Sequence, residues 1–334
     1  MMNFSWKDYR TVCLLLAVLA MGVLFARPAE EQERPVYNLT FIVDITRSMN
    51  AADSTQDGRA VSRLEFVKRN LRDLLVKLPC QSRVGLGLFT ERRSTLLFEP
   101  IEVCGSYAEI DAAIAQIDWR MAWAADSNIA QGLMNTLEML QHRDGSVVFI
   151  TDGHEAPPPN PRYRPDFSAL KGKVKGIIVG VGGLTAVPIP KFDSRGEPAG
   201  YYTADDVPHR SSFGESNLDP SQIEGYNARN APFGSAKVTG SEHLSALHET
   251  YLEELALAAG LRYARLSDAE ALAEAVQRPE FALTKKVAGD VRRQPALFAL
   301  LMTVIVYWPF GLRRLKNALL SIRRKVVGYA ARTL

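Results

Sequence analysis

Cysteine and histidine are scarce in this sequence of 334 residues, which contains three cysteines and five histidines. Cys13, Cys80 and Cys104 stand far apart, so the sequence lacks the closely spaced cysteines of a structural zinc site. Cys80 and Cys104 are the two cysteines outside the long apolar runs, and such a pair forms a disulfide in an oxidising compartment. Two separate buried thiols are the alternative, and the residues alone favour neither.

The sequence has little net charge, +3, and its positive charge is concentrated at the end of the chain. Arg313–Leu334 holds seven of the 40 Lys and Arg residues and none of the 37 Asp and Glu residues. The rest of the chain is therefore slightly acidic, whereas a nucleic-acid-binding domain carries positive charge on its folded surface. We therefore expect no nucleic-acid partner.

Two apolar runs contain no charged residue: Thr11–Ala26 and Pro295–Leu312. A membrane-spanning helix needs about 20 apolar residues, and with their flanking residues we expect both runs to span a membrane. A cleaved signal peptide is the alternative for the first run, because Lys7 and Arg10 precede it, although it lacks a clear small-x-small cleavage site. A buried core helix is the alternative for the second run.

Basic residues cluster before the first run and after the second, and such flanks stay in the cytoplasm. We therefore expect an inner-membrane protein with both termini cytoplasmic and the residues between the two runs in the periplasm. Apolar positions within the basic tail favour an amphipathic helix on membrane lipids, with a solvated flank as the alternative. The predicted order is a cytoplasmic N-terminus (1–10), an anchor (11–26), a linker (27–35), a folded domain (36–277) with a long insertion (182–240), a linker (278–294), a membrane helix (295–312) and a basic cytoplasmic tail (313–334).

The folded domain alternates between strands and helices. The predicted strands, such as 36–43 and 146–151, are continuous apolar runs, and helical spacing of leucines predicts a helix over 63–78. This pattern indicates an α/β fold with a doubly wound, mostly parallel sheet. Ligand sites in such sheets lie at the carboxyl ends of the strands, where Asp44 and Asp152 stand.

Oxygen-bearing side chains follow these two strands. Asp44, Thr46 and Ser48 form a D-x-T-x-S motif, in which alternate side chains of an extended turn face the same way. Ser127 precedes a predicted helix, and Asp152 follows the second strand. Carboxylates and hydroxyls without sulfur or imidazole suit a small hard cation, chiefly Mg²⁺ and otherwise Mn²⁺. The alternative for each hydroxyl is that it caps a helix.

The segments DITRSM, ADSNIAQGL and ITDG resemble the three loops of a von Willebrand factor A (VWA) domain with a metal-ion-dependent adhesion site. The resemblance covers 36–277 and implies a Rossmann-like sheet with one antiparallel edge strand, at 95–103. It also implies a divalent cation held directly by Thr46, Ser48 and Ser127. Asp44 and Asp152 would act through water, and an acidic side chain of a partner would fill the open coordination position.

Two positions depart from the usual pattern of this family. Ser127 stands in place of threonine but keeps the hydroxyl, and Asp126 replaces a small residue. The additional carboxylate of Asp126 is expected to raise the affinity for the cation or to shift the preference towards Ca²⁺.

The second half of the chain resembles membrane-anchored bacterial VWA proteins encoded beside MoxR-type AAA+ ATPases, a set that includes the aerotolerance (Bat) group. The segments that carry this resemblance are Gly180–Tyr202 and LEELALAAGLRYARL. FEPIEVC, DWRMAWAADS and TDGHEAPPPNPRYRP are most similar to the MxaL-type proteins of methanol-oxidation gene clusters.

The MxaL-type resemblance implies an accessory factor that helps to insert calcium into a periplasmic methanol dehydrogenase. The implied partners are a periplasmic client with an acidic side chain, such as that dehydrogenase, and other VWA or MoxR-associated membrane proteins. The alternative is a Bat-type protein of envelope stress or assembly.

An enzymatic role has weaker support in the sequence. His154 is the one histidine close to the predicted cation loops, and with Asp152 and Glu155 it could support metal-dependent hydrolysis. No second base or oxyanion device is recognisable in the sequence. We therefore expect a non-enzymatic binding module in which Asp126, His154 and Glu155 lie at the rim of the site and contact a partner.

Overall fold

The computed structural model describes residues 9–25, 29–122, 126–158, 165–193, 195–207, 227, 240–290 and 292–307. Two compact units are distinguished: Pro35–Thr284, and a smaller unit formed by Met1–Arg34 with Lys285–Leu334. The predicted basic tail at 313–334 and most of the predicted insertion at 182–240 lie outside the described residues. Each unit is described by itself.

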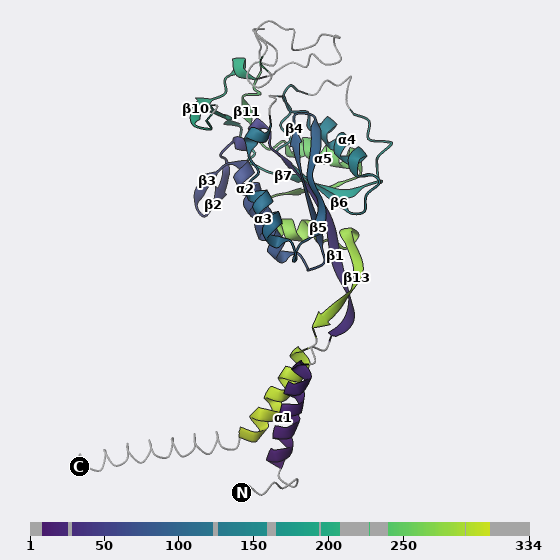
Figure 1. Cartoon of the computed structure of the whole chain (residues 1–334). Coiled ribbons are helices and arrows are strands. Elements are labelled where there is room, and N and C mark those ends of the chain that lie inside the picture. Colours follow the sequence, from purple (N-terminus) through teal and green to yellow (C-terminus); the bar gives the residue numbers. More distant parts are fainter. Residues whose placement is uncertain are drawn as a thin grey trace, which may run out of the picture. The chain divides into compact units, whose positions relative to one another are not determined.

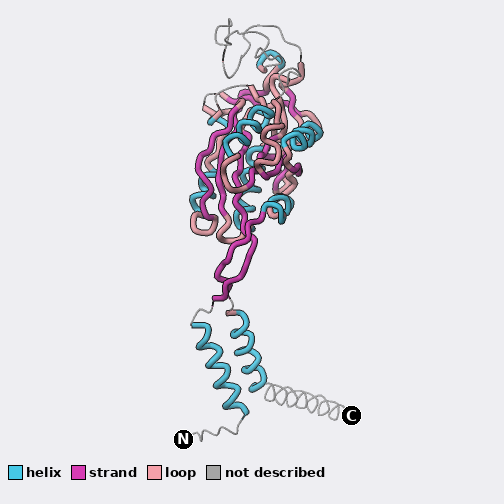
Figure 2. The backbone as a smooth tube through the Cα atoms, turned by 90° about the vertical axis from the view of Figure 1, so that its right-hand side faces the viewer, coloured by secondary structure: helices cyan, strands magenta, loops and turns pink. Residues whose placement is uncertain are grey.

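A seven-stranded sheet forms the centre of the larger unit (Figures 1 and 2). The strand order is β12-β7-β6-β1-β4-β5, and β13 also pairs with β1. β5 is antiparallel to β4 at one edge, and the pairings from β12 to β4 are parallel. The strands are β1 (Ala29–Asp44), β4 (Arg83–Thr90), β5 (Arg93–Glu102), β6 (Ser146–Thr151), β7 (Lys175–Gly180), β12 (Arg262–Arg265) and β13 (Ala282–Asp290). This topology confirms the predicted α/β class, the mostly parallel sheet and the antiparallel edge strand.

Both faces of the sheet are covered by helices, as a parallel sheet requires. Alternate side chains of β1 enter different cores: Phe41 and Val43 pack with α2, α3 and α6, and Ile42 packs with α4 and α5. Figure 1 shows α2 and α3 on one side of the sheet and α4 and α5 on the other. The helices are α2 (Arg63–Lys77), α3 (Tyr107–Ala115), α4 (Ile129–Leu140), α5 (Glu249–Ala259) and α6 (Ala269–Val276).

The helix ends follow local rules. The Ser62 side chain accepts a hydrogen bond from Glu65 N at the start of α2, and the Asp268 side chain accepts one from Ala271 N at the start of α6. Gly260 ends α5 with φ at 75°, a left-handed conformation that favours glycine. These caps fix where the chain enters and leaves the helices beside the sheet.

Short elements lie outside the main sheet. A hairpin joins β2 (Ser54–Gln56) and β3 (Arg59–Val61) ahead of α2. The described part of the insertion contains the pair β9 (Pro190–Phe192) and β10 (Pro198–Tyr201), and β8 (Val187–Pro188) pairs with β11 (Leu244–Ser245). Ile189, Tyr202 and Val207 form a small apolar cluster of their own within these residues.

Cys80 and Cys104 form a disulfide, which settles the alternative that the sequence left open. The bridge joins the chain just after α2 to the chain just after β5. Cys13 is free and lies in α1 (Tyr9–Phe25) of the smaller unit.

The smaller unit contains α1 and a helix at 293–307, which pack through Ala17, Ala20 and Ala299. α1 has 17 residues, and the second helix is described only as far as residue 307. Among the described residues, no helix is both long and apolar enough to cross a membrane. The predicted membrane spans at 11–26 and 295–312 are therefore not supported.

Candidate functional site

The two carboxylates predicted from the strand ends lie at neighbouring positions. β1 and β6 run in parallel with Val43 opposite Ile150, so Asp44 and Asp152 leave the sheet at the same edge. Both side chains are fully buried. Two distant parts of the sequence therefore meet at the carboxyl end of the sheet, as the fold class predicts.

Asp44 is held by the turn that follows β1. Its Oδ1 accepts a hydrogen bond from Thr46 N at 2.8 Å, and its Oδ2 accepts one from Thr151 Oγ1 at 2.6 Å. Burial and then the charge of Asp152 raise the pKa of Asp44, and hydrogen bonds from Thr151 and Thr46 offset this only in part. Asp44 is thus the carboxylate of the pair that takes up a proton more readily.

Asp152 has the opposite electrostatic environment. Burial alone would raise its pKa, but the guanidinium of Arg63, the nearby His154 and hydrogen bonds from His154 N and Ser48 bring it below its ordinary value. Arg63 Nη1 donates to Asp152 Oδ2 at 2.5 Å, and His154 N donates to Oδ1 at 2.9 Å. Asp152 is therefore ionised and firmly positioned.

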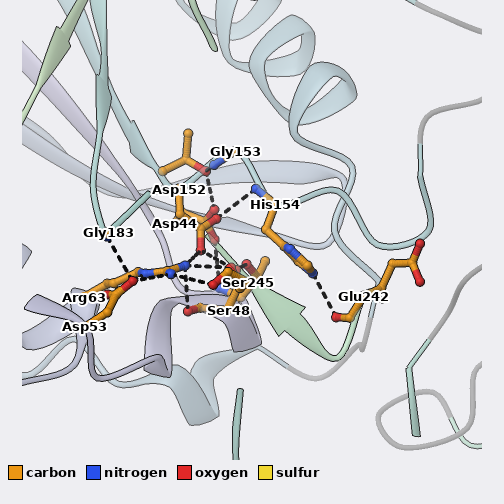
Figure 3. A network of polar contacts seen from close by, with 12 residues as sticks. Asp44, Ser48, Asp53, Arg63, Asp152, Gly153, His154, Gly183, Glu242 and Ser245 are labelled. Atoms are coloured by element: carbon orange, nitrogen blue, oxygen red, sulfur yellow. Dashed lines mark hydrogen bonds and ion pairs between the residues drawn. The ribbon is translucent and has the colours of Figure 1, made fainter. Parts of the chain in front are cut away.

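Arg63 is a fully buried cation at the first position of α2 (Figure 3). Its Nε and Nη2 donate to the two carboxylate oxygens of Asp53, at 2.9 and 2.6 Å. Its Nη1 also donates to Ser245 Oγ at 2.7 Å, and its Nη2 donates to Ser245 O at 3.1 Å. The guanidinium thus joins the loop after η1 (Arg47–Asn50), the end of β6 and strand β11.

The same network holds the start of the insertion. Gly183 N donates to Asp53 Oδ2 at 2.9 Å. Gly182 has φ at 115°, and a Cβ atom there would lie 2.5 Å from Arg63 Nε. Only glycine therefore fits both the backbone conformation and the close approach of Arg63.

Sequence reasoning missed Arg63 and Asp53. A signal was present, because Arg63 stands one turn before Val67 and two turns before Asn70, on a stripe of α2 that is buried. A charged residue on a buried helical stripe needs an ionic partner. Nothing in the sequence marks Asp53 or Ser245 as that partner.

The three predicted hydroxyl ligands lie around one small cavity. Thr46 Oγ1 and Ser48 Oγ are 3.4 Å apart, and both residues line the cavity together with Ser127. Ser127 Oγ is buried and has no hydrogen-bond partner among the described atoms. The cavity has a volume of about 10 Å³, which suits one water molecule or a small cation.

Helix capping does not account for these hydroxyls. Asn128 caps α4 through its side chain, which accepts from Gln131 N, and Thr46 makes no side-chain cap bond to η1. The backbone of Ser127 pairs instead with that of Ala156, through Ser127 N to Ala156 O at 2.6 Å and Ala156 N to Ser127 O at 2.9 Å. This bridge holds Ser127 against the segment that follows Asp152.

Other residues around the cavity include Ile189 and Val207 of the insertion and Glu242, which follows it. Arg47 also contributes, with its guanidinium 4.6 Å from the centre of the Tyr202 ring. In the described residues no three His, Cys, Asp or Glu side chains converge as a metal site would need. A cation here would therefore depend on the hydroxyl groups.

Asp126 is engaged by a neighbouring cation rather than by the cavity. Its carboxylate forms an ion pair with Arg92, and it is absent from the residues that line the cavity. The expected effect of Asp126 on cation affinity stays a prediction, and the pairing with Arg92 shows that its charge is shared.

The sequence predicted that His154 and Glu155 lie at an exposed rim of the site, but this prediction is wrong. Both are more than nine-tenths buried. The chain just after the insertion contributes to this burial, because His154 Nε2 lies 3.1 Å from Glu242 O (Figure 3). Burial lowers the pKa of His154 to about 4, so the ring is neutral at pH 7.

Glu155 points towards the helices α4 and α5. Its Oε1 accepts from Ala130 N at 3.1 Å and from Tyr251 Oη at 2.5 Å. Burial raises the pKa of Glu155 to about 7, against the effect of these hydrogen bonds.

Loss of Arg63 should destabilise the fold far more than loss of a surface arginine on the same helix. Arg63→Gln leaves Asp53 and Asp152 buried without a counter-charge, and we expect the free energy of unfolding to fall by about 3–5 kcal/mol. Arg69→Gln is the control, because Arg69 pairs with Asp57 at an exposed position, and it should cost less than about 1 kcal/mol. Urea denaturation of both variants measures this, and equal small losses would contradict the role of Arg63.

The raised pKa of Glu155 predicts a specific pH dependence of stability. The folded protein binds a proton at Glu155 between its ordinary value of 4.5 and about 7, so this group's contribution to stability falls as the pH rises through that window. Glu155→Gln cannot ionise, and its stability relative to the unmodified protein should rise by roughly 3 kcal/mol from about pH 4 to about pH 8. If the free energies of unfolding of the two proteins change equally with pH, the raised pKa of Glu155 is refuted.

Comparison with known proteins gives a family for part of the chain. The von Willebrand factor type A domain family matches residues 39–154. Curated proteins give no match.

Several solved structures are similar to this chain at low sequence identity. An aerotolerance-related membrane protein from Bacteroides fragilis is 16% identical, with 72% of this chain and 96% of that chain covered and a TM-score of 0.46. BatB from Bacteroides thetaiotaomicron is 17% identical, with 72% and 95% covered and a TM-score of 0.46. A membrane-spanning protein from Vibrio fischeri is 19% identical, with 71% and 95% covered and a TM-score of 0.26. From the match over residues 39–154, and from a parallel sheet with an antiparallel edge strand, the chain contains a von Willebrand factor type A domain.

Proposed function

We propose that this chain is a non-enzymatic VWA protein that binds a protein client through a divalent cation. The observation that carries the proposal is the Ser127 hydroxyl, which is buried without a partner among the described atoms and shares a cavity with Thr46 and Ser48. A buried hydroxyl without a hydrogen bond is costly, and a bound cation would satisfy it. The three hydroxyls would hold the cation, with Asp44 and Asp152 close behind them.

The charges around the cavity support a divalent cation. Asp53 and Asp152 pair with the guanidinium of Arg63, and Asp44 adds a third buried carboxylate whose pKa is raised in part by the charge of Asp152. A cation would offset this excess of carboxylates, and the candidate ligands are all oxygen atoms, which Mg²⁺ prefers and Mn²⁺ and Ca²⁺ also accept. When bound, the cation would supply a coordination position for a carboxylate of the client.

The arrangement of Asp152, His154 and Glu155 favours a client-binding site over a hydrolytic site. The carboxylate of Asp152 is occupied by Arg63 and His154 N, and Glu155 turns towards Tyr251. These three residues therefore do not present an aligned acid and base to a substrate. His154 instead forms part of the wall of the cation cavity.

We also propose a cellular location and a client for this protein. The disulfide between Cys80 and Cys104 supports an oxidising compartment such as the periplasm. Large apolar side chains exposed on both helices of the smaller unit, among them Leu19, Phe25 and Leu300, support association with a membrane. Resemblance to MxaL-type proteins makes a periplasmic methanol dehydrogenase, matured by calcium insertion, the client that we propose.

Removal of single oxygen ligands tests the cation site. We expect Ser127→Ala and Asp44→Ala to weaken Mg²⁺ binding by at least about tenfold, because each removes an oxygen from the site. Ser168→Ala is the control, since the Ser168 hydroxyl is exposed and bonds to Asp166. Isothermal titration of the full chain measures the affinities, and identical Mg²⁺ affinity in all four proteins would rule the proposal out.

Mg²⁺ binding should also release protons. The pKa of Asp44 is raised, so below that value a proton competes with the cation, and affinity should rise with pH. The heat of Mg²⁺ binding near pH 6.5 should then depend on the ionisation enthalpy of the buffer. A heat that is the same in every buffer would show that Asp44 is already ionised or takes no part.

A further inference from the structure

A second cavity, of about 290 Å³, lies at the amino end of the sheet, opposite the end that carries the cation cavity. Strands β1 and β4 contribute Asn38, Thr40 and Arg83 to its lining, and the loop between α4 and β6 contributes Asp144. Its volume is that of a pocket for a small molecule. The proposed cation site makes no use of this cavity.

Thr40 brings a hydroxyl into this cavity from the sheet itself. The residue is only 6% exposed, and it lies on the same face of β1 as Ile42, which packs with α4 and α5. Its hydroxyl forms no hydrogen bond with any described atom, but unlike the enclosed Oδ1 of Asn38 it keeps accessible surface. A hydroxyl both donates and accepts, so this group is available to a ligand in the cavity.

Four charged side chains line the cavity, and two of them are free. Arg143 forms an ion pair with Glu99. Among the described residues, Arg83 and Asp144 have no ion pair and no side-chain hydrogen bond, with each other or with any other group. Both residues are exposed, so their side chains can turn towards a ligand without a change in the fold. The cavity therefore offers one free charge of each sign.

The register of the sheet keeps these two charges apart. Arg83 lies opposite Asn38 across the β1–β4 pairing. On the other side of β1, the Asn38 side chain donates to the backbone oxygen of Asp144 at 2.6 Å. Adjacent strands are about 4.8 Å apart, so Arg83 and Asp144 flank Asn38 at backbone positions roughly 10 Å from each other. Gly145 keeps the loop this close to β1, since a Cβ atom there would lie 2.7 Å from Asn38 O.

A zwitterion matches this arrangement better than a simple ion does. A carboxylate accepts from the Arg83 guanidinium and from the Thr40 hydroxyl, which lies two residues along β1 on the same face as Asn38. An ammonium donates to the Asp144 carboxylate. A simple anion or cation would leave one of the two charges without a partner. In an α-amino acid the nitrogen and the carboxyl carbon are about 2.5 Å apart, and a hydrogen bond of about 2.9 Å at each end gives a span that fits between the two residues.

The remaining walls of the cavity favour an aliphatic side chain on the ligand. Leu140, Val147 and Val174 line the cavity and belong to the core between the sheet and helices α4 and α5. An apolar group that covers them removes apolar surface from water, which stabilises the complex.

We propose that this cavity, the Arg83–Asp144 site, binds an α-amino acid with an aliphatic side chain. Arg83 and Thr40 hold the carboxylate, Asp144 holds the ammonium, and Leu140 and Val147 contact the side chain. The divalent cation takes no part in this binding, so the proposal is independent of the function proposed above.

The experiment compares three compounds that share one aliphatic group. L-leucine carries both charges, 4-methylpentanoate lacks the ammonium, and 3-methylbutylamine lacks the carboxylate. Each is titrated into the full chain by calorimetry, with EDTA present so that the cation site is not involved. We expect L-leucine to bind at least about tenfold more tightly than either of the others, because each loses a charge-assisted hydrogen bond.

Matched variants locate the binding. Arg83→Gln should weaken L-leucine by about tenfold and leave 3-methylbutylamine unchanged, because this amine has no carboxylate for Arg83. Asp144→Asn should also weaken L-leucine, but it should leave 4-methylpentanoate unchanged. Thr40→Val keeps the shape of the side chain and should weaken L-leucine severalfold. Arg69→Gln is the control, since Arg69 pairs with Asp57 at an exposed position outside the cavity.

Three results would each overturn the proposal. The first is that L-leucine shows no saturable binding, which would mean that Arg83 and Asp144 are ordinary solvated charges. The second is equal affinity for the three compounds. The third is an equal effect of Arg83→Gln and Arg69→Gln on L-leucine.

Discussion

The ion pair between Arg63 and Asp152 is the interaction on which the carboxyl edge of the sheet depends. Both side chains are fully buried, and Asp53 neutralises the other side of the guanidinium. A buried charge is tolerated only where its partners are close and well aligned, so this group fixes the relative positions of η1, α2 and the end of β6. The main contribution of this ion pair is to the geometry of the site rather than to net stability. The site is assembled from parts far apart in the sequence, and the ion pair holds them in place.

That geometry connects the insertion to the site. Asp53 accepts from Gly183 N, Arg63 bonds to Ser245, and His248 N donates to Asp152 O at 2.9 Å. The insertion therefore leaves and rejoins the domain directly over the two carboxylates. Two of its described residues, Ile189 and Val207, line the cation cavity. The insertion therefore forms part of the surroundings of the proposed cation site.

Much of this arrangement follows from simple sequence patterns. Continuous apolar strands that alternate with amphipathic helices predict the parallel sheet, and the sheet brings Asp44 and Asp152 together because both follow neighbouring strands. The hydroxyls at Thr46, Ser48 and Ser127 share a cavity, as the spacing of the motif and the VWA resemblance predict. These features depend on local periodicity and on the regular geometry of parallel sheets.

Features that depend on long-range contacts could not be predicted. Ser245 lies 182 residues from its partner Arg63, and no local pattern links the two. His154 and Glu155 were predicted at an exposed rim because they follow Asp152 in a proline-rich loop, but Glu242 and Tyr251 cover them from distant parts of the chain. Apolar composition predicted two membrane spans, whereas helix length in the described residues does not support them.

The central claim is that the hydroxyls of Thr46, Ser48 and Ser127 hold a divalent cation at the carboxyl end of the sheet. Anomalous diffraction from crystals of the protein grown with Mn²⁺ tests it most directly. The account predicts a single strong anomalous peak in the cavity between these three side chains, with Asp44 and Asp152 behind it and the Arg63–Asp152 pair intact. A cavity that holds only water at saturating Mn²⁺, or a peak elsewhere on the domain, would contradict it.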